Sequence, residues 1–232
     1  MKFAEQRSKQ NVKRDQPFAE VSICPPFPRS ALCSLAEVWT FLCSTQFNQA
    51  MSLVGPYSNV KRVPDGAATL TYANEARPQI SAQYVEIGRH GLLFAATQLR
   101  VVRWNGDADG RPQLSCEDVV KPLLRLFASA HRFYGQYGYQ GGLLVSTSLQ
   151  NVNLWAMRFV APGRVEFNDD PEDFRCHTDL VSAERLVTVD QIRTQAVDVL
   201  TGILSDLTWP FWQSAKELPV ARIRQDIEPH VR

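Results

Sequence analysis

The segment from Ser115 to Val160 constrains the fold of this chain more than any other stretch. Apolar side chains follow helical spacing through its first half, which predicts one amphipathic helix. Glycines between Gly135 and Gly142 end that helix. Two apolar runs, 143–149 and 152–160, then predict strands that pair as a hairpin. This unit builds a core but carries no recognisable reaction chemistry.

Two more helices are predicted from capping boxes, in which Ser or Thr precedes a Glu or Gln by three residues. Ser34 with Glu37 begins a helix that ends before Gly55-Pro56. Thr188 with Gln191 begins the clearest amphipathic helix, which continues to Leu207. Pro122 lies inside the central helical pattern, so it either kinks that helix or marks its first turn. Short apolar or alternating runs predict strands over 17–28, 68–72, 80–87, 92–96, 98–104 and 180–188.

Runs of strands separated by single helices predict an α+β fold, with mostly antiparallel sheet packed against about three main helices. The link Gly88–Gly91 predicts a hairpin between two of the strands. We expect a basic tail over 1–16, one domain over 17–214 with a subdivision near 105–115 left open, and a polar C-terminal tail over 215–232.

The composition is that of an ordinary globular protein, with 44% hydrophobic and 21% charged residues among 232. The net charge of +1 gives no global attraction to nucleic acid or membrane, so such binding needs a local patch. The five cysteines are unevenly spaced and form no C-x-x-C pair, which predicts reduced thiols, no zinc site and a cytoplasmic location. No cofactor and no metal is expected, and no membrane association.

The glycine cluster that follows the central helix is not a phosphate loop. Phosphate loops lead from a strand into a helix N-terminus, whereas these glycines follow a helix. They are typical of a C-terminal helix cap. Tyr134, Tyr137 and Tyr139 beside them are candidates for lining a ligand or partner site.

Catalytic chemistry has only weak candidates. Residues 105–110 fit the first half of a calcium loop, but Cys116 stands where the loop needs a bidentate Glu. Asp107, Asp109, Asp169 and His177 would serve a dispersed hydrolase or nuclease site. A solvated polar loop explains the same acids, so no catalytic residue is assigned.

Aromatic and basic residues give the remaining binding candidates. Trp209, Phe211 and Trp212 directly follow the last predicted helix and either anchor a partner or close the chain's own core. Lys9, Lys13 and Arg14 in the tail, with Arg89, are the candidate nucleic-acid contacts.

Three stretches, PFAEVSICPPFP, QYVEIGRHGLLF and LFASAHRFYGQYGYQGGLLVSTSLQNVNLWAM, occur in an order that resembles the C-terminal region of prokaryotic proteins beginning with a Schlafen AlbA-type DNA-binding domain. The resemblance covers most of residues 17–160. The AlbA-type domain itself is not recognised in the chain. The resemblance therefore implies a bacterial context of DNA-linked regulation or defence, and it transfers no catalytic residue.

The sequence thus favours a non-enzymatic binding or accessory module that recognises a protein partner or a small ligand, with nucleic acid bound only indirectly. A hydrolase acting on nucleic acid or nucleotides is the first alternative. A structural oligomerisation domain, in which the helix over 190–207 pairs with its own copy, is the second.

Overall fold

The computed structural model describes residues 16–27, 30–51, 58–71, 83–99, 101–103, 112–158, 175–212 and 220–231. Its strands are β1 (Phe18–Cys24), β2 (Ser58–Val63), β3 (Gly66–Thr71), β4 (Gln83–Gly88), β5 (Leu93–Gln98), β6 (Val101–Arg103), β7 (Pro112–Ser115), β8 (Gly142–Gln150), β9 (Ala156–Arg158) and β10 (Leu180–Thr188). Its helices are α2 (Leu35–Cys43), α3 (Thr45–Ala50), α4 (Cys116–Gln136), α5 (Val189–Thr194), α6 (Ala196–Thr208), the 3-10 helix η3 (Trp209–Phe211) and α7 (Val220–Val231).

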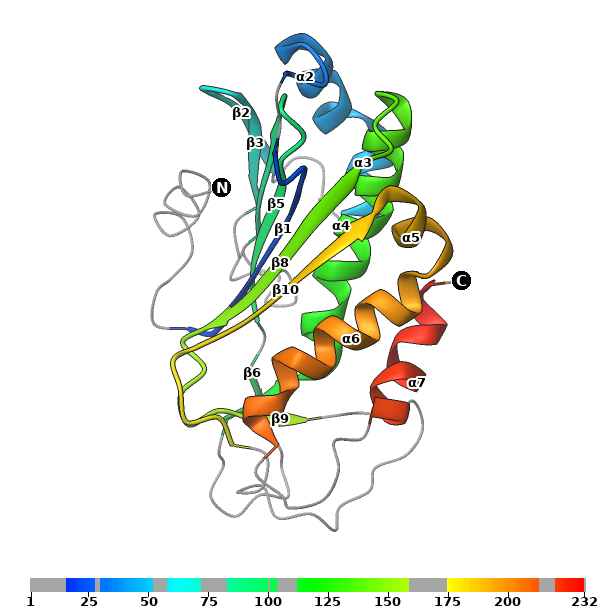
Figure 1. Ribbon diagram of the computed structural model, residues 1–232. Coiled ribbons are helices and arrows are strands. Elements are labelled where there is room, and N and C mark those ends of the chain that lie inside the picture. The colour runs from blue at the N-terminus through cyan, green and yellow to red at the C-terminus, as the bar shows by residue number, and fades with distance from the viewer. Residues whose placement is uncertain are drawn as a thin grey trace.

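Seven of these strands form one antiparallel sheet in the order β10-β8-β1-β5-β4-β3-β2. The helices pack against one face of this sheet, with α4 crossing its middle, α5 and α6 covering the β8 and β10 side, and α7 packed on α6 and α4 (Figure 1). This arrangement confirms the predicted α+β class. The predicted hairpin at Gly88–Gly91 is also confirmed, because β4 and β5 pair with Ile87 opposite Leu93.

Strand alternation decides which side chains enter the core. In β1, Ala19, Val21 and Ile23 point toward the helices and join the main hydrophobic cluster, which also contains most buried residues of α4 and α6. Phe18 and Glu20 alternate with them and point to the opposite face. That face carries a smaller apolar cluster around Tyr84 and Phe94, so the central strands are buried on both sides.

The two strands that follow α4 do not pair as the predicted hairpin. β8 belongs to the large sheet, whereas β9 belongs to a second sheet of three strands in the order β6-β7-β9. β8 pairs with β1 on one side and with β10 on the other, so its hydrogen-bonding edges are both occupied. Asn151 and Leu154 adopt positive φ angles of 58° and 63°, and the chain between them leaves the large sheet. β9 then pairs in parallel with β7.

Both predicted capping boxes are present, at Ser34 and at Thr188. The two helices they begin are each interrupted, however, because Ser44 caps a new helix and Gln195 leaves helical geometry. Pro122 lies inside α4, which begins at Cys116, so the proline does not mark the first turn of the helix.

The C-terminal segment differs from the expected polar tail. Residues 220–231 form α7, which packs on α6 and α4. Ile223 and Ile227 lie one helical turn apart and are both fully buried. Ile223 and Ile227 dock this helix, whereas the apolar Val220 and Ala221 are exposed.

Candidate functional site

Of the three tyrosines predicted to line a site, Tyr134 lies in the core at the C-terminal end of α4. The Tyr134 side chain is fully buried, and its hydroxyl lies 2.6 Å from the Gly91 carbonyl oxygen and 3.1 Å from that of Ile23. Burial raises the pKa of Tyr134 well above its usual value. This phenol therefore donates to the backbone at the ends of β1 and the β4–β5 turn, and it is not open to a ligand.

The other two tyrosines reinforce the same region from a half-buried position. The Tyr139 hydroxyl donates to the Gly142 carbonyl at 2.8 Å, which closes the turn between α4 and β8. The Tyr137 ring packs edge-on against Phe133 with centroids 4.9 Å apart, and burial raises its pKa to about 12. The ligand-binding role of these tyrosines stays a prediction. Their observed contacts hold the end of α4 to the start of β8 and to the core.

The aromatic segment after α6 divides into buried and exposed members. Phe211 is fully buried in the main core, and Trp212 packs partly against it. Trp209 is 66% exposed. Phe211 therefore has no surface to offer a partner, and Trp209 is the most exposed of these three aromatic side chains.

The outer edge of β10 is one of the two edges of the large sheet. β10 is nine residues long and is the terminal strand of the large sheet. Its even-numbered side chains lie on the face away from the helices, since Val181, Ala183 and Val187 are buried beneath α6 and its neighbours.

The registers of the neighbouring strands and a hydrogen bond at the end of β10 show which of its backbone groups point outward. The Leu99 amide donates to the Pro17 carbonyl in register with the β1–β5 pairing, so odd-numbered backbone groups of β1 bond β5 and even-numbered ones bond β8. The β8–β10 register then places the odd-numbered backbone groups of β10 toward β8. At the end of β10, the Thr188 amide donates to the side chain of Gln191 and not to β8. Backbone groups alternate in direction along a strand, so the N–H and C=O groups of Ser182, Glu184 and Leu186 point outward.

Exposed apolar side chains flank this edge. Leu180 and Leu186 are 55% and 69% exposed on the face away from the helices. On the helix side, Arg185 reaches Asp206 of α6 at 2.8 Å and lies over Gly202, where a Cβ atom would come within 2.6 Å of the guanidinium. Arg185 is therefore drawn toward α6, where it does not cover the strand edge.

The polar candidates do not converge in the described residues. Arg89 sits in the β4–β5 turn, 3.8 Å from Asp65, and His177 is exposed. The basic residues Lys9, Lys13 and Arg14 and the acids Asp107, Asp109 and Asp169 lie outside the described residues. Within the part that is described, no three His, Cys, Asp or Glu side chains are grouped to hold a metal ion.

Comparison with known proteins gives no assignment: no family model, no curated protein and no solved structure matches this chain. Among the described helices, none has the length and apolar character needed to cross a membrane.

Sequence reasoning identified β10 as a strand but not as an edge. The signal in the sequence is that leucines occur at even positions and valines at odd positions of the same strand. That pattern gives β10 apolar side chains on both faces, although the described helices cover only one.

Proposed function

We propose that this chain is a non-enzymatic protein-binding module, in which the edge of β10 accepts an extended segment of a protein partner as an additional strand. The supporting observation is the outward-pointing backbone of Ser182, Glu184 and Leu186. Strand addition to an exposed edge obtains affinity from backbone hydrogen bonds and specificity from neighbouring side chains.

The exposed apolar side chains around β10 fit this use. Leu180 and Leu186 offer apolar contact to alternate side chains of an added strand. Trp209 follows α6, which runs back along β10, as the Arg185–Asp206 contact shows. Tryptophan contributes strongly to protein interfaces when it is covered on binding.

The opposite edge of the sheet is less suited to strand addition. β2 has six residues, and Lys61 and Arg62 are exposed on it. Charged side chains on an edge strand, lysine above all, oppose pairing with another chain. In β10, the two charged residues are Glu184 and Arg185, and the latter is paired with Asp206.

A proline substitution separates the edge backbone from the rest of the module. Ser182→Pro removes the Ser182 hydroxyl and its outward backbone N–H, but it leaves the odd-numbered backbone groups of β10 that bond β8. Ser182→Ala also removes the hydroxyl but keeps the backbone N–H. A partner would be isolated from the source by cross-linking, and its affinity for each variant measured by calorimetry. We expect Ser182→Pro to raise Kd at least tenfold and Ser182→Ala to leave it nearly unchanged.

Thermal unfolding of both variants provides the control for folding. Equal affinity of two folded variants for the partner would show that the β10 edge does not bind it. Capture of a second copy of this chain alone would favour the oligomerisation alternative instead.

The hydrolase alternative stays a prediction, because three of its four residues lie outside the described residues. The DNA-linked context implied by the Schlafen resemblance, and a bacterial cytoplasmic setting, are likewise proposals. They are compatible with a module that joins one protein to another.

A further inference from the structure

β10 lacks the features that keep an edge strand from pairing with another chain. It is nine residues long and contains neither proline nor lysine. The backbone groups of Ser182, Glu184 and Leu186 point outward, as the registers of the sheet show. Natural edge strands are short, charged, twisted away or covered, because an open edge pairs readily with another strand. The length and composition of β10 therefore favour an edge that another strand covers.

A second copy of this chain carries a strand of the right kind. A twofold axis perpendicular to the sheet brings two β10 strands together antiparallel, and it keeps the helices of both copies on the same side. Even-numbered residues of β10 then face even-numbered residues of the second copy, because those residues carry the outward N–H and C=O groups. Such pairing joins two seven-stranded sheets into one continuous sheet.

The side chains on the face away from the helices fit one register of this pairing. In the register centred on Ala183, Leu180 faces Leu186 of the second copy, and Ser182 faces Glu184 of the second copy. The two leucines are 55% and 69% exposed in the single chain, so each leucine pair removes apolar surface from water. The Ser182 hydroxyl can donate a hydrogen bond to the opposite carboxylate. The twofold axis makes each of these contacts twice.

The neighbouring registers match these side chains less well. In the register centred on Glu184, the two Glu184 carboxylates lie opposite each other, and like charges directly opposite destabilise a strand pair. In the register centred on Ser182, Glu184 faces Leu180 of the second copy, and the leucine pair is lost. The register centred on Ala183 therefore gives the best match on this face.

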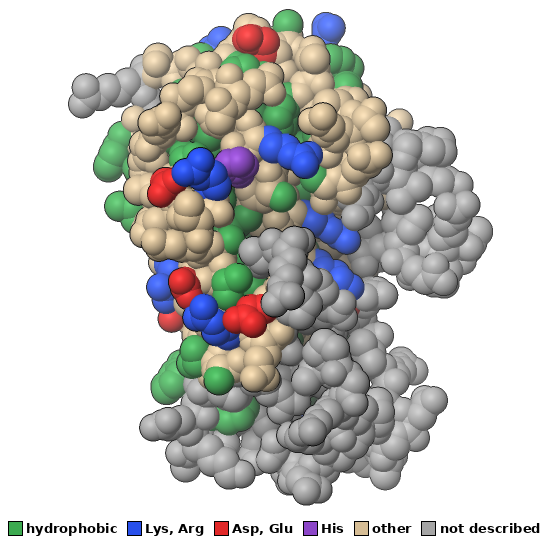
Figure 2. Space-filling model, turned by 90° about the vertical axis from the view of Figure 1, so that its right-hand side faces the viewer, with side chains coloured by type: hydrophobic (Ala, Val, Ile, Leu, Met, Phe, Trp, Pro, Cys, Tyr) green, Lys and Arg blue, Asp and Glu red, His purple; other side chains and the backbone are tan. Residues whose placement is uncertain are grey.

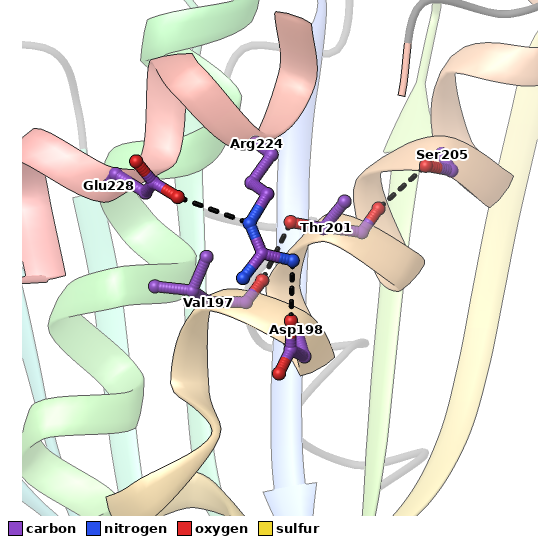
Figure 3. Close-up of polar contacts among 6 residues, drawn as sticks. All are labelled: Val197, Asp198, Thr201, Ser205, Arg224 and Glu228. Atoms are coloured by element: carbon purple, nitrogen blue, oxygen red, sulfur yellow. Dashed lines mark hydrogen bonds and ion pairs between the residues drawn. The ribbon is translucent and has the colours of Figure 1, made fainter. Parts of the chain in front are cut away.

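The helices beside β10 do not oppose this pairing through their charges. Figure 2 shows acidic side chains next to basic ones on the side of the molecule that carries α7. Arg185 of β10 pairs with Asp206 of α6 at 2.8 Å. Arg224 of α7 lies between Asp198 of α6, at 2.7 Å, and Glu228, at 3.1 Å (Figure 3). Both acidic residues of α6 are thus paired within their own chain, which reduces repulsion between the α6 helices of two copies.

We infer that two copies of this chain pair through β10, in the register centred on Ala183, when no other strand occupies that edge. The second copy and the proposed protein partner would use the same outward backbone groups, so they compete for β10. The dimer itself needs only this chain, and its test therefore does not depend on the partner.

Cysteine cross-linking of the full chain tests this register. Opposite residues of a hydrogen-bonded antiparallel pair have Cα atoms about 5.5 Å apart, which suits a disulfide. In the inferred register, residue 182 faces residue 184 and not its own copy. We expect an oxidised equal mixture of Ser182→Cys and Glu184→Cys chains to give at least about fivefold more cross-linked dimer than either variant alone. The unmodified chain, with its five natural cysteines, gives the background.

Sedimentation equilibrium measures the dimer without cross-linking. The unmodified chain and Ser182→Ala should both dimerise, because both keep the outward N–H of residue 182. Ser182→Pro lacks that N–H in both copies, and we expect it to raise the Kd of the dimer at least about tenfold. Thermal unfolding of each variant provides the control for folding.

Two results would overturn the inference. One is an unmodified chain that stays monomeric at every concentration, which would leave a partner strand as the occupant of β10. The other is cross-linking of either variant alone as efficient as that of the mixture, which would show a different contact. A dimer in the inferred register whose chains bind no partner strand would support this inference and count against the proposed function.

Discussion

At the scale of single residues, Trp209 and Phe211 are two positions apart but occupy opposite environments. Phe211 is fully buried and Trp209 is 66% exposed, because the η3 turn directs one ring inward and leaves the other outside. Sequence alone could not separate them, since both are large aromatics after the same helix. The burial of each side chain in the fold distinguishes a core residue from a surface residue.

This contrast predicts opposite effects of alanine substitution. Phe211→Ala should lower the free energy of unfolding by about 3–5 kcal/mol, because it leaves a cavity in the core. Trp209→Ala should change it by no more than about 0.5 kcal/mol. Urea unfolding of the two variants measures both values, and a large loss for Trp209→Ala would mean that this side chain belongs to the core.

At the scale of elements, α7 shows how two buried isoleucines dock a helix. Ile223 and Ile227 fill the contact with α6 and α4, and Arg224 joins α6 through Asp198. The Arg224 and Asp198 side chains are 48% and 59% exposed, so solvent screens their attraction. The buried isoleucines therefore stabilise this docking more than the ion pair does.

Substitutions on α7 test that order. Ile227→Ala should reduce the free energy of unfolding by about 2–5 kcal/mol, as expected for a large-to-small change in a core. Arg224→Ala should have a clearly smaller effect, and that effect should shrink further at high salt. Chemical unfolding at two salt concentrations distinguishes the two; an equal loss for both variants would contradict this view of α7.

At the scale of the whole molecule, a buried thiol makes the free energy of unfolding fall at alkaline pH. Burial, with a smaller effect of Glu37, raises the pKa of Cys33 to about 11 from an ordinary thiol value of 9.0. In that interval the unfolded chain has lost the thiol proton while the folded chain still holds it. Unfolding then releases a proton, so this contribution to stability is complete below pH 9 and disappears as pH rises toward 11.

Cys33→Ala tests this linkage. The free energy of unfolding of the unmodified chain should fall between about pH 9 and about pH 11, and the variant should lose less stability over the same interval. Tyr137 and Tyr134 keep their own, higher-pH contributions in both proteins because burial raises both pKa values. Identical pH profiles would show that the Cys33 thiol does not ionise on unfolding.

The sequence by itself determined the local features of this protein. Capping boxes at Ser34 and Thr188 and the glycine turn before β5 act within a few residues, so each was predicted from neighbours in the chain. The α+β class followed from the order of such segments. The proposed β10 edge was less accessible, because the strand was visible locally and its place at the end of the sheet was not.

Tertiary structure alone decided which strands became neighbours and which side chains became accessible. β8 pairs with β1, which lies more than a hundred residues earlier in the chain, and on its other side with β10. This strand order places β10 at the edge of the sheet. The same packing buries Tyr134 and leaves Leu186 exposed. Strand pairing and burial depend on contacts between distant segments, and a pattern read along one chain does not specify them.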